Sequence, residues 1–231
     1  MSRSLLEGTS VGVDYLPPKR LPINRVENWL RKHRTDRFPA YDAFVSIGAA
    51  VPGLQFYTTL RQTNIRLVTI DIAYAQIPEG ERVVIGAQGD YFWLNGNNLL
   101  LMLGILRRDL QLLWPEFAGV IDDNYQTSSR AIRKASLAID TLLIDQAIDG
   151  LSVTNAKHVP LAAGLSLDVV DPEEIQSLAL RGVTVGSSPA GQRRHERYWL
   201  IDDIARFNDA RIEARVHANL NSLRAIAFGN P

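Results

Sequence analysis

The stretch NLLLMLGILRRDLQLLW, residues 98–114, decides what the rest of the chain can be. Its apolar side chains recur at i, i+3, i+4 and i+7, the spacing of one face of an α-helix. Asn98 is suited to cap the start of that helix, and Pro115 cannot continue its interior. The unbroken apolar or glycine run, 99–106, is far shorter than the roughly 20 residues of a membrane span. The stretch therefore predicts a buried core helix, with Leu103 and Leu106 at the centre of its apolar face.

The composition is that of an ordinary globular protein. The chain has 231 residues, of which 46% are hydrophobic and 22% charged, and its formal net charge is zero. Neither nucleic-acid binding nor membrane attraction follows from that charge. The absence of cysteine excludes disulfides, thiolate catalysis and cysteine-ligated metals. The first 18 residues contain no apolar signal core, so we expect no secretion by a signal peptide.

Residues 41–94, which precede the core helix, are rich in strand patterns. Apolar and polar side chains alternate over 65–77, a turn is expected at 78–81, and 82–85 suits a return strand. Residues 90–94 suit another strand, and Asn95-Gly96 is a tight-turn signal. The fold class predicted from these patterns is α+β, with an antiparallel β meander packed on core helices.

The remaining segments predict how the chain is divided. Residues 117–126 are expected to be a loop, 130–149 a helix, and 192–228 mostly helical with an amphipathic pattern. The expected division is an extended N-terminal arm, 1–23, an α+β body, 24–191, and a long C-terminal amphipathic helical segment, 192–231.

The N-terminal arm carries the first set of candidate functional side chains. Its glycines and prolines leave it little means of forming its own hydrogen-bonded structure. An extended arm can bury apolar side chains only against a surface that is already folded, either its own body or a neighbouring subunit. The expected anchoring side chains are Leu5, Leu6, Val11, Val13, Tyr15 and Leu16.

A basic segment follows the arm directly. The segment contains seven basic residues and only two acidic ones, Glu27 and Asp36. Such a cluster indicates contact with nucleic acid or an acidic partner, or else a solvated helix face. The cluster consists of Lys19, Arg20, Arg25, Arg31, Lys32, Arg34 and Arg37.

No short motif identifies a catalytic, cofactor or metal site. Gly186 and Gly191 have the spacing of a phosphate-binding loop, but Gln192 and Arg193 stand where lysine and a hydroxyl residue are needed. The pair His195-Glu196 lacks the second histidine of a zinc helix. The four histidines are scattered, and the many carboxylates select no catalytic pair. We therefore assign no catalytic residue, no cofactor and no metal ligand.

The leading functional hypothesis is a structural subunit of a larger assembly, specifically a virion component of a bacteriophage capsid, neck, tail or baseplate. Its expected partners are copies of itself or other assembly subunits, with nucleic acid allowed but not favoured and no membrane. The alternative is a soluble hydrolase-type enzyme that acts on a carbohydrate or nucleotide through Asp/Glu residues. A third is a nucleic-acid-associated protein. The expected location is the virion or the cytoplasm.

Overall fold

The computed structural model describes residues 1–74, 81–86, 89–165, 167–189 and 197–226. The contacts of the chain divide it into two compact units. Unit 1 contains Met1–Val83, Leu101–Gln126 and Ala205–Asp209, and unit 2 contains Val84–Leu100, Thr127–Ile204 and Ala210–Pro231. Each unit is described below by itself. The division of the sequence into 1–23, 24–191 and 192–231 stays a prediction.

The sheet of unit 1 has two parallel strands, β1 (Ala43–Ser46) and β2 (Val68–Asp71). Ala43 pairs with Val68, and Ser46 with Asp71. Parallel strands need a crossover connection. Here the crossover contains the 3₁₀ turn η1 (Pro52–Leu54) and the short helix α3 (Tyr57–Leu60).

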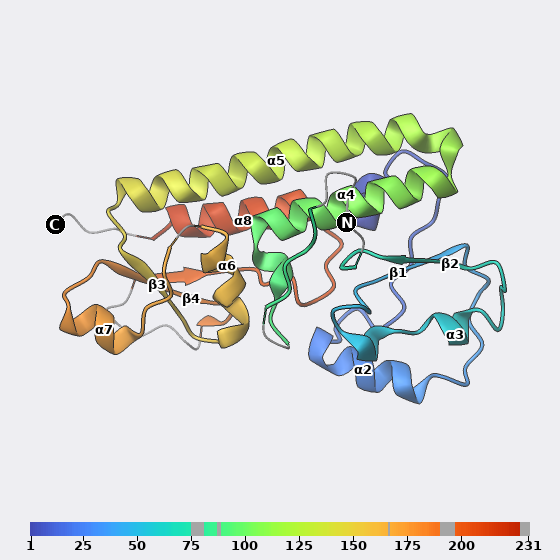
Figure 1. The fold of residues 1–231 in the computed structure, drawn as a ribbon, viewed down its shortest axis with the longest axis horizontal. Helices are drawn as coiled ribbons and strands as arrows, with labels where there is room; N and C mark the ends of the chain where they lie inside the picture. Colours follow the sequence, from blue (N-terminus) through green and yellow to red (C-terminus); the bar gives the residue numbers. More distant parts are fainter. Residues whose placement is uncertain (75–80, 87–88, 166, 190–196, 227–231) are drawn as a thin grey trace. The chain divides into compact units, whose positions relative to one another are not determined.

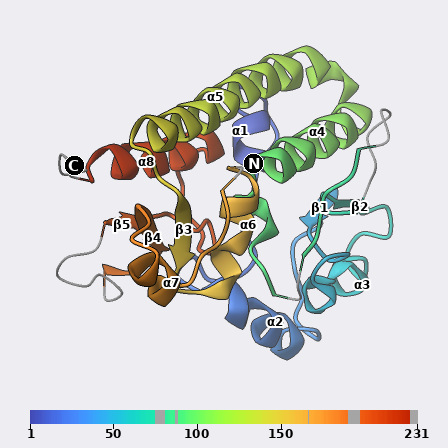
Figure 2. The ribbon, with the colours of Figure 1, turned by 60° about the vertical axis from the view of Figure 1, so that its left-hand side comes forward.

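The core of unit 1 lies between this sheet and two helices. Helix α2 (Ile23–Lys32) and α3 lie on the same side of the strands in both Figure 1 and Figure 2. The two helices, the residue that precedes α3 and the loop before β2 supply the buried side chains Val26, Leu30, Phe56, Leu60 and Leu67. Each such side chain contributes about 1.5–3 kcal/mol when fully buried, before the cost of ordering the chain.

Helix α4 (Gly96–Leu113) confirms the helix predicted from 98–114. Leu103, Ile105 and Leu106 are fully buried, as the apolar spacing requires. Asn98 is buried within the first turn, where its side chain bonds the backbone of Val84 and Phe92. Its role is therefore to fasten neighbouring segments to the helix, and the predicted cap hydrogen bond is replaced by one that Asn95 Oδ1 accepts from the Asn97 amide.

After the 3₁₀ turn η3 (Pro115–Phe117), helix α5 runs over Ala118–Asp145. The prediction of a loop over 117–126 was wrong, because its polar residues make tertiary contacts within unit 1. Asp122 forms an ion pair with Arg107 at 2.8 Å, and the Asn124 amide donates to the carbonyl oxygens of Leu5 and Glu7. These partners are distant in sequence, so the local pattern of charges resembled a turn.

Unit 2 is built on a second parallel sheet, in the order β3 (Gly150–Val153), β4 (Gly182–Gly186), β5 (Tyr198–Leu200). The connection from β3 to β4 contains the 3₁₀ turn η4 (Ala156–His158), α6 (Val159–Ala163) and α7 (Pro172–Ser177). Before α4 lies a further 3₁₀ turn, η2 (Phe92–Leu94).

Helix α8 (Ile212–Arg224) completes unit 2. It lies alongside the part of α5 that belongs to the same unit (Figures 1 and 2), where Ser128 Oγ donates to Glu213. The fully buried Trp199 of β5 donates its indole N–H to the Asn219 carbonyl of α8 at 2.8 Å. This bond fixes α8 against the sheet.

The predicted antiparallel meander was wrong, because every described strand pairs in parallel. Residues 82–85 form no strand, and 92–94 form η2. Strand β5 lies inside the stretch predicted to be helical, of which α8 is the described helical part. Parallel partners are joined through crossovers and leave no hairpin signal in the sequence. Residues 78–80 of the expected turn lie outside the described residues.

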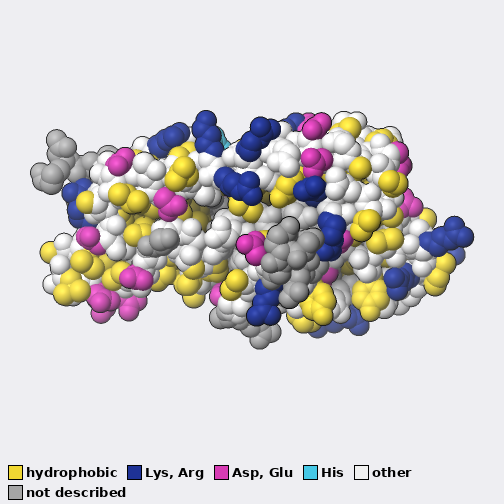
Figure 3. Space-filling view, turned by 45° about the horizontal axis from the view of Figure 1, so that its top comes forward, with side chains coloured by type: hydrophobic (Ala, Val, Ile, Leu, Met, Phe, Trp, Pro, Cys, Tyr) yellow, Lys and Arg dark blue, Asp and Glu magenta, His cyan; other side chains and the backbone are white. Residues whose placement is uncertain are grey.

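The surface carries both signs of charge. Figure 3 shows lysine and arginine side chains interspersed with aspartate and glutamate on the face that it displays. This mixture agrees with a net charge of zero. Among the described helices, none combines the length and the apolar character needed to cross a membrane.

Candidate functional site

One buried polar side chain of unit 2 that lacks hydrogen bonds within the described part of the chain is His158, the last residue of η4. It is only 1% exposed, and neither ring nitrogen has a hydrogen-bond partner among the described residues. Buried polar groups are nearly always paired, and an unpaired one costs about 1–3 kcal/mol. A buried imidazole without partners therefore marks a place where another group is expected.

A carboxylate lies next to this imidazole. His158 Nε2 and Asp203 Oδ2 are 3.8 Å apart, which is longer than a hydrogen bond. Two atoms at this separation can both hydrogen-bond to one small group placed about 2.8 Å from each. The Trp93 indole N–H donates to the Asp203 carbonyl at 3.0 Å and so fixes the backbone that carries the carboxylate.

Aromatic rings form one wall of the cluster. Tyr91 stacks on Trp93 with ring centroids 5.0 Å apart, and the rings of Tyr91 and His158 are 6.0 Å apart. The Tyr91 amide donates to the Lys157 carbonyl at 3.0 Å, which ties the segment before η2 to η4. The Lys157 ammonium lies 5.4 Å above the Tyr91 ring. We name His158, Asp203, Tyr91, Trp93 and Lys157 the His158 cluster.

The segment that carries Asp203 is held from its other side by a buried ion pair. Arg215 of α8, 9% exposed, donates to both carboxylate oxygens of Asp202, at 2.7 and 2.6 Å. The Asn219 side chain bonds the backbone N–H and C=O of Asp202. Ile204 has a φ of 58°, a left-handed conformation that is strained for a β-branched residue. Strain held by such surrounding structure is typical of functional segments.

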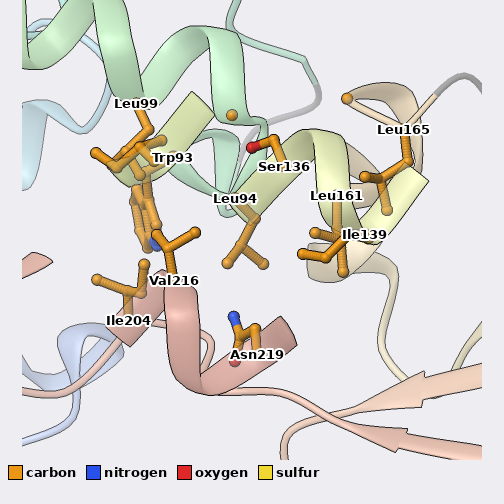
Figure 4. Close-up of a pocket in the computed structure, with 13 residues that line it drawn as sticks. Trp93, Leu94, Leu99, Ser136, Ile139, Leu161, Leu165, Ile204, Val216 and Asn219 are labelled. Atoms are coloured by element: carbon orange, nitrogen blue, oxygen red, sulfur yellow. The ribbon is translucent and has the colours of Figure 1, made fainter. Parts of the chain in front are cut away.

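A small cavity lies beside the cluster, inside unit 2 (Figure 4). Its volume is about 40 Å³, which is room for a few water molecules. Trp93 and Ile204 line it together with side chains of α4, α5, α6 and α8, most of them apolar. Ser136 and Asn219 are polar exceptions in its wall. The cavity is too small for a drug-sized ligand, and neither His158 nor Asp203 lines it. The buried imidazole, without hydrogen bonds to the described residues, is what marks the His158 cluster as the candidate site.

The predicted anchoring residues of the arm lie in unit 1. Leu5 and Leu6 are buried, while Val11, Val13 and Leu16 are partly buried. Leu5 belongs to a short helix, α1 (Ser2–Leu5). A role for these residues in contact with another subunit stays untested.

The predicted basic cluster lies on the surface of unit 1. All seven of its members, from Lys19 to Arg37, are exposed. Lys19 pairs with Asp209 at 3.3 Å, and Arg31 bonds to Asn28 within α2. Gly191, Gln192, Arg193, His195 and Glu196, which were considered for nucleotide or zinc binding, lie outside the described residues.

Sequence reasoning missed the proximity of His158 and Asp203. A usable signal was present, because His158 follows β3 and Asp203 follows β5. The carboxyl ends of parallel strands meet at one edge of a sheet, where ligands of α/β proteins bind. The assumption of antiparallel pairing removed that signal.

The described side chains of unit 2 do not supply enough ligands for a metal ion. The described residues contain no group of three histidine or acidic side chains that could hold one. The His158 cluster supplies one imidazole and one carboxylate. Zinc sites in proteins use at least three protein ligands.

Comparisons with known proteins concern the fold. No family model and no curated protein matches this chain. Solved structures do match it. The SBP FpvC from Pseudomonas aeruginosa in complex with Mn²⁺ is 14% identical, with a TM-score of 0.62 over 97% of this chain and 93% of that one. The Zn(II)-bound ZnuA-like domain of Streptococcus pneumoniae AdcA is 13% identical, with a TM-score of 0.62 over 99% and 94%.

A third match is a point mutant, in its metal-free form, of a periplasmic metal-binding protein from Candidatus Liberibacter asiaticus. It is 11% identical, with a TM-score of 0.63 over 96% of this chain and 93% of that one. By their descriptions two of the three hold a bound metal ion and the third is a metal-binding protein, and FpvC is an SBP; none is described as a virion component or a hydrolase.

These matches overturn the functional hypotheses drawn from the sequence. The prediction of a virion structural subunit was wrong, and so were the hydrolase and nucleic-acid alternatives. The expected partners, which were copies of itself or other assembly subunits, were therefore also wrong. The expected virion or cytoplasmic location was wrong as well, and the third neighbour is described as periplasmic. An arm and an amphipathic helix are too general to identify an assembly protein. The likeness shows that this chain has the fold that these substrate-binding proteins share.

Proposed function

We propose that this chain is a substrate-binding protein that captures a small solute for uptake, outside the cytoplasm. The observation that supports this proposal most is the extent of the fold likeness, which covers 97% of this chain and 93% of FpvC. A match over nearly the whole of both chains includes both units of this protein. A shared domain alone would not produce that coverage.

The fold does not name the solute, because one fold hosts many functions. FpvC was solved with Mn²⁺ and with Ni²⁺ bound, and the ZnuA-like domain of AdcA with Zn²⁺. In this chain the described donor set does not fit such an ion, since His158 and Asp203 leave its coordination incomplete. The His158 cluster is therefore proposed as a site for a solute recognised by hydrogen bonds.

The test is a thermal-shift panel on protein dialysed against a chelator. The probes are Mn²⁺, Ni²⁺ and Zn²⁺ chlorides, then neutral polyols, primary amines and small carboxylates. A solute that binds only the folded chain stabilises it by RT ln(1 + [L]/Kd), about 2.7 kcal/mol at 100 times Kd. We expect one class to raise Tm in a saturable manner. If none of the four classes shifts Tm, the proposed function is wrong.

A further inference from the structure

We propose that the captured solute is a neutral hydroxylated compound, and that one of its hydroxyl groups bridges His158 Nε2 and Asp203 Oδ2. This inference rests on the proposed function. It goes further by assigning the solute class and the two side chains that recognise it.

The hydrogen-bonding capacities at the His158 cluster favour a hydroxyl group. A carboxylate only accepts hydrogen bonds, and a neutral imidazole with its proton on Nε2 donates from that nitrogen. A hydroxyl group both donates and accepts. It can therefore donate to Asp203 and accept from His158 at the same time. With Nε2 and Oδ2 3.8 Å apart, one oxygen at a hydrogen-bond distance of about 2.8 Å from each atom is geometrically compatible with the pair.

The charges around the cluster disfavour charged solutes. A carboxylate solute would place a second negative charge beside Asp203. An ammonium solute would be attracted by Asp203 but would lie near the Lys157 ammonium, and because it has donors only it could not accept a hydrogen bond from His158. Like charges at such short range repel, and the cost grows where water is excluded. A neutral hydroxylated solute meets neither obstacle.

The aromatic wall provides the complementary apolar contact. Tyr91 and Trp93 are nearly parallel, with 19° between their planes, and the Tyr91 ring lies beside the imidazole. Ligand sites combine apolar and aromatic surface with a few placed polar groups.

The polar groups are also held in place before binding. The Trp93 indole fixes the Asp203 backbone, and the Asp202–Arg215 ion pair fixes the residue before it. The Tyr91–Lys157 backbone bond fixes η4. Pre-positioned donors and acceptors reduce the entropy lost on binding. Because His158 is 1% exposed, this inference requires that unit 2 opens locally to admit the solute.

A bridging water is the simplest alternative occupant, since buried water commonly satisfies unpaired polar groups. The experiment therefore measures binding by titration calorimetry with three named polyols, glycerol, myo-inositol and D-glucitol. The variants are His158→Phe, which keeps a ring and removes both nitrogens, and Asp203→Asn, which keeps the shape of the carboxylate. The matched control is His217→Phe, at an exposed position of α8 in the same unit.

We expect at least one polyol to bind the wild type. Its affinity should fall at least tenfold in His158→Phe and in Asp203→Asn, and it should be unchanged in His217→Phe. Circular dichroism checks that each variant folds. If His158→Phe does not fold, His158→Gln and Asp203→Asn carry the test.

The outcomes separate this inference from the proposed function. If a polyol binds with the same affinity to the wild type and to both site variants, the His158 cluster is not its site and the inference is wrong. If only amines, carboxylates or metal ions bind, the solute class is wrong while the proposed function stands. If no solute of any class binds and the site holds water alone, both proposals are wrong.

Discussion

The rings of Tyr15 and Phe207 stack with their centroids 4.6 Å apart and 26° between their planes. Arg3 and Lys19 also lie over the Phe207 ring, at 5.1 and 5.3 Å from its centroid. Both side chains donate to the carboxylate of Asp209. Within unit 1, the N-terminal segment is thus held against residues 205–209 by the aromatic stack and by two basic side chains that donate to one carboxylate.

These contacts lead to the first prediction, which concerns deletion of residues 1–16. The deletion removes the Tyr15–Phe207 stack, the buried Leu5 and Leu6, and the carbonyl partners of Asn124. We expect a clear fall in Tm, measured by differential scanning calorimetry, with the oligomeric mass unchanged by light scattering. Tyr74→Ala, at a side chain that is 79% exposed in the same unit, is the control and should leave Tm as it is. A deletion that alters the mass instead would show that the arm binds a neighbour.

A second prediction concerns acid unfolding. Hydrogen bonds from Arg3 and then from Lys19 lower the pKa of Asp209 below its ordinary value. A carboxyl group with a lowered pKa stabilises the folded state above its unfolded value, about 3.9, and loses that contribution as pH falls through the folded value. Asp209→Asn should therefore lower Tm at pH 7 and should converge with the wild type at the acid end. The check is Tm measured from pH 7 downward; parallel curves would contradict the role of Asp209. Because Asp209 is exposed, the effect should shrink in high salt.

A third prediction addresses the core of α4. Leu103 and Leu106 are fully buried, so truncation of either to alanine should cost about 2–5 kcal/mol of unfolding free energy. Leu112→Ala, on the same helix at a side chain that is 77% exposed, is the matched control. Denaturant melts provide the measurement. Equal melts for the buried and the exposed substitutions would mean that α4 is peripheral.

A fourth prediction concerns the Asp202–Arg215 ion pair. Removal of one partner of a buried pair leaves the other charge uncompensated, which costs about 3–5 kcal/mol for full burial. Since 30% of the Asp202 side chain is exposed, Asp202→Ala should cost about 2–3 kcal/mol. The exposed Asp145→Ala in the same unit should cost less than about 0.5 kcal/mol. Urea melts of the two variants provide the comparison, and equal losses of stability would mean that the ion pair does not support the Asp203 segment.

The helical core of this fold could be predicted from the sequence, and its sheets could not. The spacing of leucines in 98–114 is a local signal, and α4 forms where it predicts. The pairing of β1 with β2 has no comparable signal, because the strands are separated by a crossover that includes α3. The alternation over 65–77 indicated a strand, yet it said nothing about the direction of its partner.

The candidate site was hidden for a related reason. His158 lies in η4 and Asp203 in the segment after β5, and neither belongs to a short motif. Their proximity follows from the parallel order β3-β4-β5, which brings the ends of β3 and β5 to one edge. The missing hydrogen bonds of His158 are a property of packing, so no reading of the sequence alone could find them.

The central claim is that this chain captures a small solute. Its most direct test is titration calorimetry with the solute that gives the largest rise in Tm. The stoichiometry distinguishes capture at one site from general stabilisation of the protein. The account predicts a saturable isotherm with one solute per chain, weakened at least tenfold in His158→Phe and unaffected in His217→Phe. It is contradicted if no solute class gives saturable heat with the wild-type chain.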